Sequence, residues 1–393
     1  MKFFDELETI KKFIIKNILK NEKVKKMSKK NVFIYPSYSL RSYKTNKYIL
    51  DSDPAFRQTL AEIKAVKDLF NEINLIIPKN IEKSVMLPEI KKEVNIIKKN
   101  YGMNVKNERF RKDDKEFFKS LDLQNKDIFY TNFLTKKDVF INSGIDIRKT
   151  IFTFLYFYPK ICFSDFNGIE KALKVIFRTE KAREHFLSNF HKLSLYKTEI
   201  IRAYHESFCS KKIIIPEDFD RKRILLIPSR FTVEDHNHSF KSLSYSLLLK
   251  SQMKDKKPKV KLIIANPNYS LDKVEYPDLV DVLGPLSRNE YERLLREEVG
   301  LILSLKLHDF DSSKGAPEYL YSNLIFLSND YQINPINLPI NPEILLWKMS
   351  KLISCGRKEY VEYKKQQKKI AEKYHGLSQI KNGFKKILKE AKF

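Results

Sequence analysis

The segment from Ser304 to Glu318 holds the most concentrated set of groups in the chain that could do chemistry. The hydrophobic run just before it, Leu301–Ser304, is typical of a buried strand, and a polar loop follows. Pro317 and Glu318 then begin a predicted helix, because proline suits the first helical turn. A carboxylate there can accept hydrogen bonds from a ribose diol, while exposed helix N–H groups favour a nearby phosphate. The alternative is that Glu318 only interacts with its own helix dipole.

Strand-like and helical segments alternate along nearly the whole chain, which is typical of parallel α/β proteins. We predict strands at 31–35, 73–77, 127–130, 160–163, 223–227, 259–264, 280–283, 301–304 and 324–327. We predict helices at 55–70, 91–99, 168–190, 240–250, 289–297, 317–322, 341–353 and 360–374. The predicted fold is therefore α/β, with two Rossmann-like domains, an interdomain cleft and a helical C-terminal tail. Ligands of such sheets bind beyond the carboxyl ends of the strands.

The predicted boundaries divide the chain into four parts. Residues 1–30 form a basic amphipathic helix, 31–215 the first Rossmann-like domain, 216–355 the second, and 356–393 basic C-terminal helices. A length of 393 residues suits two domains of this size.

The chain is strongly basic, and the charge is concentrated at its two ends. It has 75 Lys and Arg against 49 Asp and Glu, a net charge of +26, which favours an anionic partner. Residues 1–30 hold ten Lys against four acidic residues, and residues 356–393 hold twelve Lys and Arg against four. Three explanations of these basic ends stay open. They form amphipathic helices that lie on an anionic membrane, they form ordinary helices with a solvated lysine face, or they reflect a lysine-rich composition without a selected partner.

Composition also excludes several classes. With only 9 glycines, and neither a P-loop nor a G-x-G-x-x-G motif, the chain does not read as a P-loop NTPase or a standard dinucleotide-binding protein. Its 3 cysteines are isolated, which argues against a disulfide framework and a cysteine-rich zinc site. No run reaches the length of about 18 apolar residues that spans a bilayer. We expect a cytoplasmic protein, with peripheral attachment at the inner face of a membrane as a further option.

Several short motifs between residues 213 and 355 resemble, in their order and spacing, those of group 1 (family 4) glycosyltransferases of the GT-B fold. They are Pro216-Glu-Asp-Phe-Asp220, the strand and loop 224–230, Val282-Leu-Gly284, the strand 301–304, Pro317-Glu318 and the helix 341–354. The resemblance implies that residues 216–355 bind a nucleotide-sugar donor and that residues 31–215 bind the acceptor. It also implies retention of anomeric configuration and no metal ion or cofactor beyond the nucleotide sugar.

The same resemblance assigns roles to single residues. Glu318 matches the second Glu of the family's E-x7-E motif, which holds the donor ribose. The first Glu falls at Phe310, which is flanked by Asp309 and Asp311 as candidate substitutes. Arg230 matches the arginine that pairs with the donor diphosphate, and a guanidinium suits that role because it forks onto phosphate oxygens.

Further donor contacts are expected in the two loops that carry these residues. The loop Ser312, Ser313, Lys314, Gly315 and Ala316 is expected near the sugar or the phosphates. His236 and His238 either contact phosphate or are ordinary exposed loop histidines.

The favoured function is transfer of a sugar from a nucleotide-diphosphate donor to a glycan or lipid-linked acceptor, in cell-surface polysaccharide or glycoconjugate synthesis. Two alternatives stay open. One is a non-catalytic nucleic-acid binder, suggested by the charge of +26 and 20 Tyr. The other is a metal-dependent, single-domain GT-A glycosyltransferase in which Asp51 and Asp53 hold the metal, although Asp53 before Pro54 is also a simple helix cap.

Overall fold

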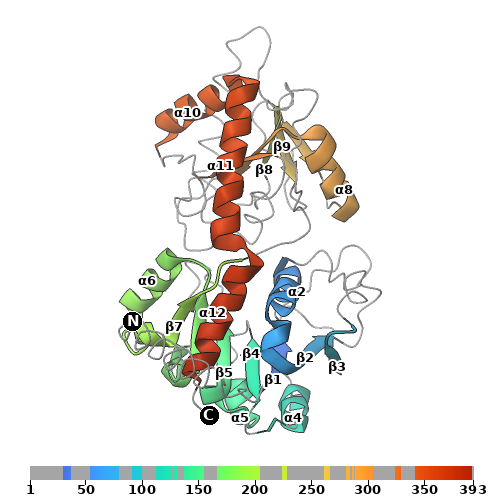
Figure 1. Ribbon diagram of the computed structural model, residues 1–393, viewed down its shortest axis with the longest axis vertical. Helices are drawn as coiled ribbons and strands as arrows, with labels where there is room; N and C mark the ends of the chain where they lie inside the picture. Colours follow the sequence, from blue (N-terminus) through green and yellow to red (C-terminus); the bar gives the residue numbers. More distant parts are fainter. Residues whose placement is uncertain are drawn as a thin grey trace, which may run out of the picture.

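The strands of this protein form two parallel sheets, and helices pack on both (Figure 1). The computed structural model describes residues 30–36, 54–78, 91–99, 112–121, 123–124, 127–131, 137–154, 166–203, 224–227, 261–265, 280–283, 286, 288–304, 324–328 and 341–391. No helix within these ranges is long and apolar enough to cross a bilayer. The boundary predicted near residues 216–222 and the N-terminal helix predicted within residues 1–30 lie outside them.

Within the described residues, the first sheet has seven strands in the order β3-β2-β1-β4-β5-β6-β7. They are β1 Lys30–Tyr35, β2 Phe70–Pro78, β3 Asn95–Lys99, β4 Ile128–Thr131, β5 Thr150–Thr153, β6 Lys174–Phe177 and β7 Thr198–Ile200. The helices on this sheet are α2 Pro54–Val66, α4 Lys112–Ser120, α5 Lys137–Asn142, α6 Glu180–Asn189 and the C-terminal α12 Leu377–Glu390. Every strand pair is parallel, so all carboxyl ends lie at one edge.

Alternate residues of each strand face opposite sides of the first sheet and enter two different cores. In β1, Val32 and Ile34 join a mainly aliphatic core beneath α2 and α12. Phe33 and Tyr35 join a phenylalanine-rich core beneath α4, α5 and α6. Both faces are covered, which is why these strands are short continuous apolar runs.

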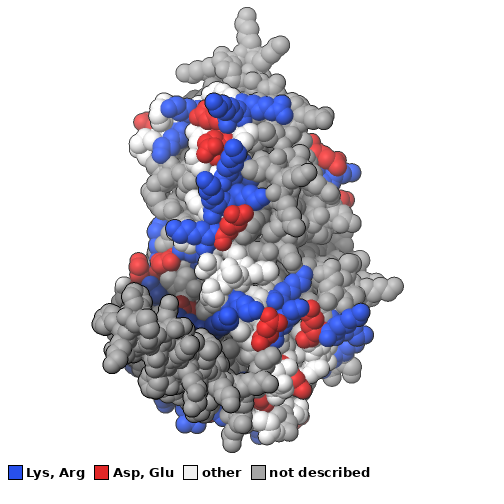
Figure 2. Space-filling model, viewed as in Figure 1, with Lys and Arg blue, Asp and Glu red and all other residues white. Residues whose placement is uncertain are grey.

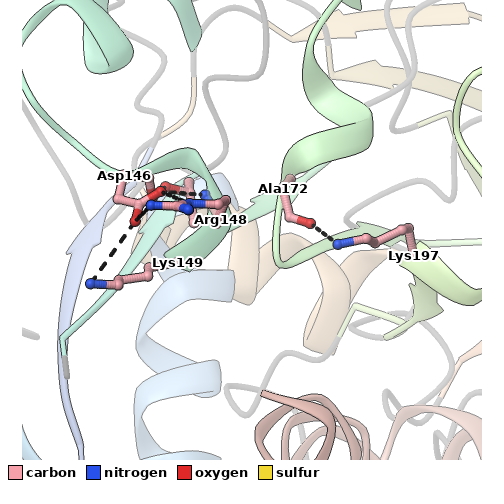
Figure 3. A network of polar contacts seen from close by, with 6 residues as sticks. Asp146, Arg148, Lys149, Ala172 and Lys197 are labelled. Carbon is pink, nitrogen blue, oxygen red and sulfur yellow. Dashed lines mark hydrogen bonds and ion pairs between the residues drawn. The ribbon is translucent and has the colours of Figure 1, made fainter. Parts of the chain in front are cut away.

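Several strands of the first sheet begin directly after a 3₁₀ turn. The turns η2 Lys67–Leu69, η4 Ile147–Lys149 and η7 Leu195–Lys197 each run straight into a strand, and η6 Ile169–Lys171 precedes β6 by two residues. In η4 the side chain of Asp146 accepts a hydrogen bond from the Arg148 backbone N–H at 2.9 Å and pairs with the Arg148 guanidinium at 3.0 Å (Figure 3). The Lys197 Nζ donates to the Ala172 carbonyl at 2.8 Å and joins η7 to the chain ahead of β6 (Figure 3).

In the part of the chain that the structure describes, the second sheet has five strands in the order β10-β9-β8-β11-β12. They are β8 Ile224–Ile227, β9 Lys261–Ala265, β10 Val280–Leu283, β11 Leu301–Ser304 and β12 Ile325–Ser328. Helix α8 Arg288–Arg293 and the π-helical turn η11 Leu294–Glu298 lead into β11. Leu294, Leu295 and Val299 are buried against Ile302 and Phe326 of the sheet.

The helices after β12 are α10 Pro342–Ser354, α11 Arg357–His375 and α12. Helix α11 lies against the outer edge of β12, whose backbone groups would otherwise be unpaired. The Gln367 amide accepts a hydrogen bond from the Phe326 N–H at 3.1 Å and donates to the Phe326 carbonyl. The Lys364 Nζ donates to the Leu324 carbonyl at 2.7 Å. Two side chains of one helix therefore complete the edge of the sheet.

Most of the predicted elements that lie within the described residues are present, and two predictions are wrong. Residues 95–99 are strand β3, although 91–99 was predicted to be helical. The predicted helix 168–190 contains strand β6 and begins as α6 only at Glu180. Strands β5 and β7 have no counterpart among the predicted elements. Helix α12 lies within residues 356–393, which were predicted to form basic C-terminal helices.

Candidate functional site

In each sheet the chain first adds strands on one side of the starting strand and then crosses to add the remaining strands on its other side. In the second sheet β8 leads outward to β9 and β10, while β11 and β12 lie on the other side. In the first sheet the reversal lies between β1 and β4. Open α/β sheets bind ligands at such switch points, beyond the carboxyl ends of the strands. The candidate site therefore has two parts. One is the carboxyl edge of the second sheet at β8 and β11, and the other is the carboxyl edge of the first sheet at β1 and β4.

Strands β8 and β11 are direct neighbours at the switch point of the second sheet. Leu301 pairs with Leu225 and Ile302 pairs with Leu226, so the two strands run in step. The last residue of β11, Ser304, is buried. The loops that follow β8 and β11 therefore leave the sheet from adjacent strand ends.

The side chains predicted to bind the donor all lie outside the described residues. They are Arg230, His236, His238, Asp309, Asp311, Ser312, Ser313, Lys314, Gly315, Ala316 and Glu318, and Asp51 and Asp53 lie outside as well. The structure does show the strands that precede the two predicted donor loops, β8 and β11. Arg230 comes three residues after the end of β8, and Asp309 comes five residues after the end of β11. Their roles stay predictions.

The carboxyl edge of the first sheet holds a buried polar network that the sequence did not indicate. The Arg178 guanidinium lies 2.6 Å from the Glu62 carboxylate, and both side chains are almost fully buried. The Tyr130 hydroxyl donates to the other Glu62 oxygen at 2.5 Å and contacts the Thr153 hydroxyl at 2.8 Å. Arg178 also donates to the Ile201 carbonyl at 2.9 Å.

This network joins helix α2 to the carboxyl ends of β4, β5 and β6 and to the residue after β7. Burial, and then the adjacent Glu62 carboxylate, raises the pKa of Tyr130 above its ordinary value, so its hydroxyl stays protonated. Desolvation lowers the pKa of the Arg178 guanidinium, but the charges of Glu62 and Tyr130 and the hydrogen bonds to both together raise it above its ordinary value. Tyr130 therefore stays neutral and Arg178 stays charged, which suits a rigid support for the edge rather than a proton-transfer site.

No local signal marks these residues in the sequence. Glu62 lies within a helical stretch like any surface glutamate, and Arg178 lies in a segment that reads as helix. Only the strand order brings them together, across more than a hundred positions of chain.

The last two helices connect the two carboxyl edges (Figure 1). Tyr360 in α11 donates to the Gly300 carbonyl just before β11, and Gln367 contacts Phe326 further along β12. Helix α11 therefore runs in the same direction as the strands of the second sheet. The eight residues from Gln367 to His375 rise about 12 Å, whereas β12 extends only about 7 Å beyond Phe326. Helix α11 thus passes the carboxyl edge of its sheet.

At its end α11 meets the carboxyl edge of the first sheet. The His375 ring Nδ1 lies 2.6 Å from the carbonyl oxygen of Ala203, three residues beyond β7. Arg202 stacks on the Tyr374 ring at 5.1 Å and also pairs with Glu180. The carboxyl edges of both sheets therefore lie toward the junction of α11 and α12, so the two switch points lie toward the same boundary.

A hollow elsewhere on the first sheet does not belong to this site. It has a volume of about 600 Å³ and is lined by the ends of α4 and α5, including Leu121, Asn142 and Gly144. These helices end just before β4 and β5 begin, so the hollow lies at the amino edge of the sheet. In the described part of the chain, no three His, Cys, Asp or Glu side chains come together as a metal site.

Comparisons with protein-family models and with curated protein sequences find no match. Solved structures do match. The trehalose-6-phosphate synthase OtsA superposes with a TM-score of 0.63 at 12% identity, covering 92% of this chain and 99% of OtsA. A UDP-forming trehalose-phosphate synthase from Burkholderia xenovorans gives 0.60 at 12% identity, over 92% of this chain and 99% of its own.

A third match is the pneumococcal O-GlcNAc transferase GtfA in complex with UDP and GlcNAc. Its TM-score is 0.50 at 14% identity, covering 72% of this chain and 60% of GtfA. At these identities the likeness shows the fold alone. The chain has the GT-B fold, an α/β arrangement of parallel sheets with a long C-terminal helix, and the predicted fold class is confirmed.

Proposed function

We propose that this protein is a glycosyltransferase that transfers a sugar from a nucleotide-diphosphate donor to a glycan or lipid-linked acceptor. The observation that carries the proposal is the adjacency of β8 and β11 at the switch point of the second sheet. The loop with Arg230 follows one strand, and the loop with Asp309, Asp311 and Glu318 follows the other. Groups suited to diphosphate and ribose thus follow neighbouring strand ends, where such sheets bind nucleotides.

The proposed chemistry needs charge stabilisation and positioning more than reactive side chains. Arg230 neutralises the negative charge that develops on the departing diphosphate. Glu318 fixes the ribose through its hydroxyls, and the Ser312–Ala316 loop contacts the sugar or phosphates. The first sheet presents the acceptor, whose hydroxyl must lie close to the anomeric carbon. In this proposal the reaction is metal-independent and retains anomeric configuration.

The similar structures suggest which donors to test first. One trehalose-6-phosphate synthase structure holds UDP-2-fluoro glucose, and the pneumococcal transferase holds UDP and GlcNAc. UDP-sugars are therefore the first donors to examine for this chain, followed by GDP-sugars. We further propose cell-surface polysaccharide or glycoconjugate synthesis as the pathway and the cytoplasmic side of the membrane as the location.

A donor-binding experiment tests the proposal directly. Thermal stabilisation by a panel of nucleotide sugars identifies the donor base, and calorimetry then measures its affinity. Glu318→Ala should weaken nucleotide binding by about tenfold or more, because a charged hydrogen bond to the ribose contributes about 1.5–3 kcal/mol. Glu372→Ala, which removes an exposed carboxylate of α11, is the matched control. Unchanged nucleotide affinity in Glu318→Ala would show that the site is wrongly assigned.

The same assays separate the two alternatives. A steep, salt-dependent affinity for random oligonucleotides without stabilisation by nucleotide sugars would favour a nucleic-acid binder. The metal-dependent alternative requires a single-domain architecture, whereas this chain has the two-sheet GT-B fold. Nucleoside diphosphate release that persists in EDTA agrees with the proposal, and its loss in EDTA would contradict the metal-independent mechanism.

A further inference from the structure

Helix α10 presents an exposed apolar face that its own packing does not use. The helix begins at Asn341, whose side chain accepts hydrogen bonds from the backbone N–H groups of Glu343 and Ile344 at 2.9 and 3.2 Å. Its inner face is buried through Met349, Leu352 and Ile353. The helix is therefore fixed to the protein on one side and open on the other.

Two large apolar side chains lie on the open side. Ile344 is 47% exposed and Trp347 is 60% exposed. They are three positions apart, and Lys351 follows four positions later, so all three lie on one helical face. The Lys351 Nζ lies 5.0 Å from the centre of the Trp347 ring. Exposing an indole and an isoleucine together costs free energy in water, which points to a partner.

The surroundings of this face are basic. Lys348 and Lys351 in α10, and Arg357 and Lys358 at the start of α11, compare with two acidic residues over the same stretch, Glu343 and Glu359. Figure 2 shows Lys and Arg side chains gathered at the end of the molecule where α10 leads into α11. A partner of complementary charge is anionic.

Within the described residues, the basic helices α11 and α12 do not combine charge with exposed large apolar side chains. The apolar residues of α12, including Ile380, Phe384 and Ile387, are buried in the core of the first sheet. In α11, Tyr360 and Ala371 are buried. Helices α11 and α12 are therefore basic on the outside but expose no large hydrophobic side chain, whereas α10 exposes two.

We propose that the face of α10 formed by Ile344, Trp347 and Lys351 docks on an anionic lipid bilayer. Trp347 and Ile344 enter the headgroup region, where amphipathic indole rings prefer to lie. Lys351, with the basic groups around it, contacts lipid phosphates. A polyanion in solution would attract the charges but offers no apolar phase for Ile344 and Trp347. This inference does not depend on the glycosyltransferase proposal, because it is tested by binding alone.

The chain contains a single tryptophan, so its fluorescence reports on this face alone. The probe is a vesicle of phosphatidylcholine with about one third phosphatidylglycerol, which mimics an anionic leaflet. We expect the emission of Trp347 to shift to shorter wavelength and to be quenched by brominated lipid. Vesicles of phosphatidylcholine alone, or high salt, should abolish most of the shift.

Variants separate this face from general electrostatic attraction. Lys351→Glu changes the local charge by two and should weaken vesicle binding by about thirtyfold, since each basic residue near the surface contributes about fivefold. Trp347→Ala, followed by vesicle sedimentation, should weaken binding by about tenfold. The matched controls are Lys385→Glu on α12 and Tyr196→Ala, which alter an exposed lysine and an exposed aromatic residue elsewhere.

Three results would overturn the proposal. The first is wild-type protein that does not bind anionic vesicles at low salt. The second is vesicle binding without any change in Trp347 emission, or binding that falls equally in the control variants. The third is an equal emission shift on adding a soluble acidic polysaccharide without lipid, which would assign this face to a polymer instead. Circular dichroism of each variant checks that the fold is retained.

Discussion

Because Lys364 is buried, we expect the free energy of unfolding to rise with pH between about pH 7 and pH 10, where it falls in most proteins. Its side chain in α11 is 1% exposed, and its Nζ donates to the Leu324 carbonyl of the chain entering β12. Burial, followed by the nearby charge of Lys368, lowers the pKa of Lys364 to about 7. In the unfolded chain a lysine titrates near pH ~10.4. Folding therefore expels a proton between these two pH values.

The sign and size follow from proton linkage. Between about pH 7 and pH 10 the unfolded chain binds more protons at this position than the folded chain, so the free energy of unfolding increases with pH. Each pKa unit corresponds to about 1.36 kcal/mol. From pH 7 to about 9.5, Lys364 alone should add on the order of 3 kcal/mol. Below pH 7 both states carry the proton and this gain is absent.

A substitution isolates the effect from other titrating groups. Lys364→Met keeps a long apolar side chain but cannot titrate. From pH 7 to about 9.5 the wild type should therefore gain about 3 kcal/mol in free energy of unfolding relative to the variant. Urea denaturation by circular dichroism at each pH measures this difference. Lys365→Met, at the exposed neighbouring position, is the control and should show no such trend. Urea midpoints of wild type and Lys364→Met that move in parallel with pH would refute the reasoning.

The remaining predictions concern contacts that hold the first sheet together. Glu62→Gln leaves the buried Arg178 without its counter-charge and should lower the free energy of unfolding by about 3–5 kcal/mol. Urea denaturation measures this loss, with Glu184→Gln at an exposed position as the control. A loss no larger than that of the control would contradict the prediction. Gly383→Ala should be destabilising although alanine favours helices by about 1 kcal/mol, because the new Cβ would lie 2.8 Å from the Ile201 side chain. Faster proteolysis of α12 in Gly383→Ala, relieved by adding Ile201→Val, is the expected result, and unchanged proteolysis would show that Ile201 can move aside.

The sequence predicts the fold best where a strand is a compact apolar run bounded by polar residues. Strands β1, β8, β10 and β11 are of this kind, and the alternation of elements is enough to indicate two parallel sheets. Strand β3 was mistaken for a helix because Val94, Ile96 and Ile97 have a spacing that a helix also produces. In the sheet, Ile96 and Ile97 point to opposite covered faces, so both are apolar for a reason that one segment cannot reveal.

The candidate site likewise has parts that the sequence predicts and parts that it does not. Its strands could be predicted because Leu301–Ser304 and Ile224–Ile227 are local signals. The buried pair Glu62 and Arg178 could not, because each residue is ordinary in its own segment and only strand order makes them neighbours. The contacts of Lys364 and Gln367 with β12 were missed for a related reason, since charged and polar residues in a helix normally indicate its solvent side.

The return of α12 to the first sheet also has a consequence for the order in which that sheet is completed. Residues 30–203 leave the ribosome well before α12, yet the core on the α2 side of their sheet includes four α12 residues, Ile380, Phe384, Ile387 and Leu388. During synthesis the first sheet therefore carries an open apolar surface until α12 has been made, although N-terminal domains generally fold first. A chain that stops after the second sheet displays that surface permanently and is a natural target for chaperones and proteases. Helix α12 is thus a late-made cover for a core whose other residues begin more than three hundred positions earlier in the chain.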